Sequence, residues 1–132
     1  MASCLNNPVL KIVLIGLAGL AGTLCRYWLS GFVAQRFGET FPAGTLVVNI
    51  VGCFLAGFLF YLMQERYLVN QTLRTMVMIG FLGAFTTFSS YGLQTLTLLR
   101  DGEFGFAALN VAVSNTVGLL VVWVGYALAK AL

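Results

Sequence analysis

The chain contains no histidine, and only 8% of its 132 residues are charged. A soluble domain of this size would have about a quarter of its residues charged. The lack of histidine excludes a histidine-based zinc site and a Ser-His-Asp triad. The low charge and the mean hydropathy of +0.95 exclude a disordered chain and a soluble globule. We therefore expect most of the chain to be surrounded by lipid.

Cysteine is also scarce, with three residues at Cys4, Cys25 and Cys53. An odd count, with two members inside long apolar stretches, argues against a disulfide framework. We interpret all three as small apolar side chains. The segment from Met1 to Cys4 lacks the basic region of a removable signal peptide, so we expect the first apolar stretch to stay in the protein.

Carboxylates are absent from the long apolar stretches. The four acids stand at the edges of these stretches, at Glu39, Glu65, Asp101 and Glu103. A proton-coupled cation exporter needs an acid within the membrane that binds the proton and the substrate in turn. This class is therefore disfavoured.

The few charges delimit the apolar stretches. No charge lies between Glu39 and Glu65, between Arg74 and Arg100, or between Glu103 and Lys130. A further stretch holds Lys11 near its start and Arg26 near its end, where long basic side chains can reach lipid headgroups. A membrane-crossing helix needs about 20 residues, so the sequence predicts helices at about residues 8–30, 42–63, 73–100 and 104–129. We expect a single all-α membrane domain over residues 1–132.

Basic residues are nearly balanced between the two ends of these spans. One end has Lys11, Arg66, Arg74 and Lys130, and the other has Arg26, Arg36 and Arg100. Orientation in the membrane normally follows an asymmetry of such residues. Either a weak signal fixes one orientation, or the chain has dual topology and pairs antiparallel with a second copy. The balance favours dual topology, and the small volume enclosed by four spans favours a dimer.

Small residues recur four positions apart within the spans. The pairs are Ala18 and Gly22, Gly52 and Ala56, Cys53 and Gly57, Gly80 and Ala84, and Ser114 and Gly118. Such pairs let helices approach closely in lipid. They could serve packing within one subunit or contacts between subunits.

The densest polar cluster inside a span covers residues 80–92. Glycines are followed there by threonines and serines, which disfavour a continuous helix. A break at bilayer depth is tolerated only where protein or water surrounds it, and such breaks create ion sites. We therefore predict that the third helix is broken near mid-membrane. An unbroken helix, with hydroxyls bonded to the preceding turn, is the alternative.

Neutral polar side chains also occur in the second and fourth spans. Thr45 and Asn49 lie one turn apart, and Asn110 shares a helix face with Ser114. They could join helices by hydrogen bonds or line a polar path. Neutral donors combined with the positive edges of aromatic rings suit a small anion. A formal net charge of +3 would help to attract one.

Three motifs resemble those of the Fluc (CrcB) family of fluoride channels. They are Gly22-Thr23-Leu24-Cys25-Arg26-Tyr27, Gly44-Thr45-Leu46-Val47-Val48-Asn49 with Gly52, and Gly83-Ala84-Phe85-Thr86-Thr87-Phe88-Ser89. The resemblance covers nearly the whole chain. It implies a fluoride-selective passive channel, not an enzyme, that exports cytoplasmic fluoride across the inner (plasma) membrane and lowers its toxicity. It further implies an antiparallel homodimer in the lipid bilayer, and we expect no nucleic-acid partner.

The resemblance also implies roles for particular residues. Arg26 matches a vestibule arginine, Asn49 a pore asparagine and Phe88 the first pore aromatic. Tyr91 stands where the family has a second phenylalanine, and Gln94 where relatives often have glutamate. The expected anion path comprises Arg26, Asn49, Thr87, Phe88, Ser90, Tyr91 and Ser114. A structural Na⁺ at the dimer centre is expected on the backbone carbonyls of Gly83 and Thr86, with no organic cofactor.

Two other functions are compatible with four short spans. A small drug or metabolite exporter of dual topology is disfavoured by the missing membrane acid. A non-conducting scaffold is disfavoured by the polar cluster of the third span.

Overall fold

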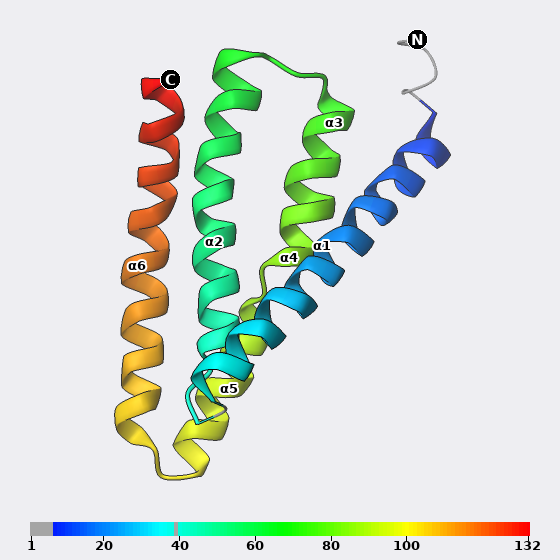
Figure 1. Ribbon diagram of the computed structural model, residues 1–132. Helices are drawn as coiled ribbons and strands as arrows, with labels where there is room; N and C mark the ends of the chain where they lie inside the picture. Colours follow the sequence, from blue (N-terminus) through cyan, green and yellow to red (C-terminus); the bar gives the residue numbers. More distant parts are fainter. Residues whose placement is uncertain (1–6, 39) are drawn as a thin grey trace.

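The computed structural model describes residues 7–38 and 40–132, and this part of the chain contains helices and short connections (Figure 1). Four helical segments are long and apolar enough to cross a membrane: Pro8–Phe37, Ala43–Arg66, Gln71–Arg100 and Phe104–Ala131. The predicted all-α membrane protein with four spanning helices is thus confirmed. Cys4 and Glu39 lie outside the described residues.

The first helix, α1 (Pro8–Phe37), begins at a well-formed cap. The Asn7 side chain accepts hydrogen bonds from the backbone N–H groups of Val9 and Leu10, at 2.9 and 3.4 Å. The helix continues past residue 30, where the sequence predicted its end, because nothing interrupts it before Gly38. Gly38 has a φ of 78°, which favours glycine and ends the helix.

The second spanning segment consists of α2 (Ala43–Phe60) and the π-helical turns of η2 (Tyr61–Arg66). The third begins with α3 (Gln71–Thr75), which Asn70 caps by accepting from the Leu73 N–H at 2.8 Å. It continues through the π-helical η3 (Met76–Leu82), the single turn α4 (Gly83–Phe85) and α5 (Phe88–Arg100). The last segment is α6 (Phe104–Ala131).

Two residues with extended backbone separate α4 from α5. Thr86 has φ −83° and ψ 155°, and Thr87 has φ −150° and ψ 112°. The Thr86 hydroxyl donates to the Leu82 carbonyl at 2.9 Å, as it would within a continuous helix, yet α4 ends at the residue before. The Thr87 hydroxyl accepts from the Ser90 N–H at 3.2 Å and thereby caps α5.

Small residues allow the spanning segments to touch along their backbones. Figure 1 shows α6 lying along α2, while α1 crosses the third segment at η3 and α4. A Cβ atom added at Gly57 would overlap the Val122 carbonyl of α6, and one at Gly22 would overlap the Phe81 carbonyl. These positions serve packing within the subunit. A Cβ atom at Gly16 would instead meet open space.

The ends of the segments form two groups. The start of α1, the α2–α3 connection and the end of α6 lie at one end of the molecule, and the other connections lie at the opposite end (Figure 1). Large apolar side chains remain exposed along the segments, including Trp28 at 65% and Trp123 at 67%. This surface suits lipid or a further protein chain.

Candidate functional site

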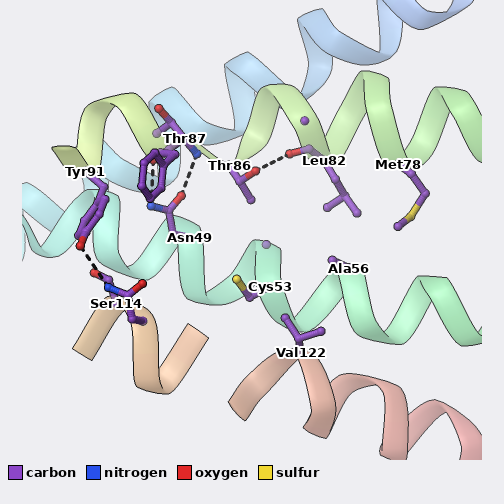
Figure 2. Close-up of a pocket in the computed structure, with 14 residues that line it drawn as sticks. Asn49, Cys53, Ala56, Met78, Leu82, Thr86, Thr87, Tyr91, Ser114 and Val122 are labelled. Carbon is purple, nitrogen blue, oxygen red and sulfur yellow. Dashed lines mark hydrogen bonds between the residues drawn. The ribbon is translucent and has the colours of Figure 1, made fainter. Parts of the chain in front are cut away.

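A pocket of about 390 Å³ lies beside the extended residues between α4 and α5 (Figure 2). It is lined by Asn49, Gly52, Cys53, Ala56, Met78, Leu82, Gly83, Thr86, Thr87, Phe88, Tyr91, Ser114, Asn115 and Val122. This lining includes most of the residues that the sequence predicted for the anion path and the Na⁺ site. Its residues come from the second, third and fourth spanning segments. We call this space the central pocket.

The other two selected residues, Arg26 and Ser90, lie in a neighbouring pocket of about 260 Å³. Its lining also contains Thr23, Tyr27, Ser30, Thr45, Val48, Thr87 and Gln94. We call it the side pocket. Thr87 lines both spaces, so the predicted site forms two neighbouring pockets that share one residue. Neither lining contains a carboxylate, and the side pocket carries the cationic Arg26.

Asn49 of α2 holds the extended segment by both ends of its amide. Its Oδ1 accepts from the Thr87 backbone N–H at 2.8 Å, and its Nδ2 donates to the Thr87 carbonyl at 3.1 Å (Figure 2). Backbone groups that leave a helix need other partners when they are buried from water. Asn49 therefore joins α2 to the third segment, and one amide hydrogen stays available to the central pocket.

The carbonyl groups of Gly83 and Thr86 lose the donors they would have in a continuous helix. The Thr87 N–H, four residues after Gly83, donates to Asn49 instead. The Ser90 N–H, four residues after Thr86, donates to the Thr87 hydroxyl instead. Orphan backbone carbonyls are ligands that suit a hard cation. Among the described residues, no group of three or more Cys, Asp or Glu side chains could hold a metal ion.

Gly52 brings α2 close to the extended segment. A Cβ atom at this position would overlap the Thr86 methyl group and would lie 3.2 Å from Cδ1 of Phe85. Only glycine fits without a shift of the neighbouring chain. From the sequence, Gly52 is expected in helix packing, either within one subunit or between subunits, and in the second motif; the structure places it in the wall of the central pocket.

Two aromatic rings stand at the start of α5. The rings of Phe88 and Tyr91 are tilted by 49°, with 5.3 Å between their centroids. Both line the central pocket, and 80% of Phe88 is exposed. The Tyr91 hydroxyl accepts a hydrogen bond from the Nδ2 of Asn115 at 3.2 Å. Sequence reasoning did not assign Asn115 a site role, although its place beside Ser114 was the available signal.

A partly buried chain of hydrogen bonds joins α5 to α6 beside the central pocket. Asn110, only 2% exposed, donates from Nδ2 to the Thr95 hydroxyl at 2.9 Å. The Thr95 hydroxyl in turn donates to the Tyr91 carbonyl at 2.8 Å, and Ser114 contacts the Asn110 Oδ1 at 3.5 Å. Asn110 thus joins the helices, one of the two alternatives left open by the sequence.

Gln94 is a further polar residue of the side pocket. Its Oε1 is buried and has no hydrogen-bond partner within the described ranges. The same residue also borders a third space of about 300 Å³ near Gly38 and Phe41. The side pocket therefore combines the Arg26 guanidinium, several hydroxyl groups and an amide. This set of neutral and positive donors can interact with an anion.

Most of the chain is similar to known proteins of one family. The family model described as "CrcB-like protein, Camphor Resistance (CrcB)" matches residues 13–126. A protein of Opitutus terrae named "Fluoride-specific ion channel FluC" is 53% identical over 120 residues, which cover 89% of this chain and 91% of its own. A protein of the same name from Desulforapulum autotrophicum is 48% identical over 120 residues (91% and 96%). Another, from Citrifermentans bemidjiense, is 46% identical over 122 residues (92% and 98%).

Proposed function

Because the chain belongs to the CrcB-like protein family, we propose that it is a fluoride-selective passive ion channel and not an enzyme. It exports cytoplasmic fluoride across the inner (plasma) membrane and lowers its toxicity. The observation that carries this proposal is the pairing of Asn49 with Thr87, which holds neutral hydrogen-bond donors around a pocket without carboxylates.

The anion path runs through both pockets. Arg26 attracts the anion into the side pocket, and the hydroxyls of Thr87 and Ser90 replace part of its water. Asn49 and Ser114 donate within the central pocket, while the ring edges of Phe88 and Tyr91 supply positive potential. Fluoride is small and demands strong donors, so a narrow path with such donors favours it over chloride. The shared lining residue Thr87 supports a connection between the pockets.

A second, antiparallel copy completes the central pocket. Phe88 lines this pocket but is 80% exposed in the single chain, which leaves its ring available for contact with another chain. The near balance of basic residues at the two ends supports insertion in both orientations. We place the extended residues Thr86 and Thr87 near mid-membrane, where backbone outside a helix requires protein or water around it.

The backbone carbonyls of Gly83 and Thr86 would hold a Na⁺ ion at the centre of this dimer. Their helical donors are engaged elsewhere, which supports the assignment. Bound there, the ion would supply positive charge to carbonyl oxygens whose helical donors are engaged elsewhere. This role is structural, and Na⁺ is the only cofactor that we propose.

Fluoride efflux from proteoliposomes under an imposed potential tests the proposed function. We expect the chain to release fluoride quickly and chloride at least about a hundredfold more slowly, because selectivity rests on size and donor strength. Empty liposomes give the background. A parallel assay with a cationic dye tests the exporter alternative, and liposomes that transport the dye but not fluoride would overturn the proposal.

A further inference from the structure

We infer that Asn115 is a positioning residue, which aims the Tyr91 hydroxyl into the central pocket as an additional donor to the anion. The inference rests on the proposed function and concerns how strongly the path binds fluoride. It is carried by the contact between these two side chains, which come from α5 and α6. Tyr91 stands at the position where the family resemblance implies a second phenylalanine.

The amide of Asn115 is fixed at two points. Its Nδ2 donates to the Val111 carbonyl of the preceding helical turn at 2.7 Å, and to the Tyr91 hydroxyl oxygen at 3.2 Å. A side-chain amide nitrogen has two hydrogens, so both are used. Because the bond to Val111 uses one hydrogen of Nδ2 and fixes the amide, the other hydrogen is directed from α6 to the Tyr91 hydroxyl oxygen of α5.

This bond decides where the Tyr91 hydrogen can point. A phenol has one hydrogen to donate and also accepts. Because Asn115 donates to the phenol oxygen, the phenol hydrogen must point elsewhere. No hydrogen bond to another described residue uses it. The central pocket, whose lining contains Tyr91, Asn115 and Asn49, is the space left for this hydrogen.

Tyr91 makes two further contacts, one through its ring and one through its backbone carbonyl. The ring is tilted against Phe88, with 5.3 Å between centroids, and the Tyr91 carbonyl accepts from the Thr95 hydroxyl at 2.8 Å. A donor held in place before the ion arrives gains more from binding than one that must first be ordered. A hydrogen bond to a charged group is also stronger than one between neutral groups. The oriented phenol therefore strengthens fluoride binding.

The test is a double-mutant cycle on the concentration of fluoride that half-saturates efflux from proteoliposomes. We expect Tyr91→Phe to raise this concentration about tenfold to a hundredfold, the size expected for one lost hydrogen bond to an ion. Asn115→Ala should raise it by a smaller factor. In the Tyr91→Phe background, Asn115→Ala should change nothing further, because the hydroxyl that it positions is absent.

The matched control is Thr97→Ala on α5, which removes only an exposed hydroxyl that bonds to its own helix. Size-exclusion elution in detergent checks that each variant is intact, and Asn115→Leu replaces Asn115→Ala if the latter fails to fold. Equal half-saturation in Tyr91→Phe and the unaltered chain would overturn the inference. So would an effect of the Asn115 substitution that persists in the Tyr91→Phe background. Absence of fluoride efflux from the unaltered chain would instead contradict the proposed function.

Discussion

At Asn49, one side chain takes over two backbone hydrogen bonds that a helix would otherwise supply. Its amide carries an acceptor and a donor at the spacing of a peptide group, and it meets the N–H and the carbonyl of Thr87 at 2.8 and 3.1 Å. The sequence alone left Asn49 as either a pore residue or an interhelical bond. The structure establishes the bond, and a role in the pore stays a prediction.

Asn49→Asp should reduce fluoride efflux from proteoliposomes at least about tenfold. The carboxylate lacks the donor for the Thr87 carbonyl, and its negative charge repels an anion. The free energy of unfolding should also fall by about 1–3 kcal/mol, because the Thr87 carbonyl is left without its partner.

The matched control for this substitution is Asn70→Asp at the start of α3. There the side chain uses only an oxygen, which accepts from the Leu73 N–H at 2.8 Å, and aspartate caps a helix equally well. Efflux should be unchanged. Undiminished efflux in Asn49→Asp would contradict the proposed path.

At the scale of elements, the close approach of α2 to the junction of α4 and α5 shapes the central pocket. Gly52 faces Thr86 and Phe85 with no room for a Cβ atom, while Gly57 of the same helix faces the α6 backbone. Small residues on two faces of α2 thus bring the third segment and α6 against it. The spacing rule for small residues predicted close packing but not the elements that would meet.

Gly52→Ala should push α2 away from the junction. Insertion of a methyl group into a filled contact costs about 1–3 kcal/mol, so we expect a loss of unfolding free energy of that size in detergent. Fluoride efflux should fall with it, because Asn49 lies on the same helix and loses its alignment with Thr87. Gly105→Ala in α6 is the control, since a Cβ atom there meets nothing within 4 Å. Equal stability of the two variants would refute this account.

At the scale of the whole molecule, exposed apolar side chains cover the length of the spanning segments, and basic residues stand at both ends. The four spanning segments carry basic residues at both ends, in nearly equal number. If the proposed dual topology holds, a few added charges should shift the balance between the two orientations. This makes dual topology open to a direct test.

Gln71→Lys with Leu132→Lys adds two positive charges to one end, and Gln35→Lys with Thr40→Lys adds two to the other. All four positions are exposed. We expect each double variant alone to insert in one orientation and to lose most fluoride resistance in cells. Co-expression of the two should restore it, because opposite orientations can then pair. Full resistance with either variant alone would rule out an obligatory antiparallel pair.

The sequence by itself determined the four long apolar helices, the polar cluster of the third span and the residue types from which the anion path is proposed. These are local properties, because hydropathy, charge spacing and backbone propensity act over a few helical turns. It placed the end of the first helix near residue 30, whereas α1 continues to Phe37, because polar and charged residues such as Gln35 and Arg36 mark the edge of a membrane but do not end a helix.

Only the tertiary structure decided which side chains meet. The pairing of Asn49 with Thr87, the bond from Asn115 to Tyr91 and the division of the site into two pockets depend on how helices far apart in the chain cross. Those crossings are set by the summed packing of small residues such as Gly22, Gly52 and Gly57 against neighbouring backbone. These packing contacts join residues far apart in the chain, so no single stretch of sequence predicts them.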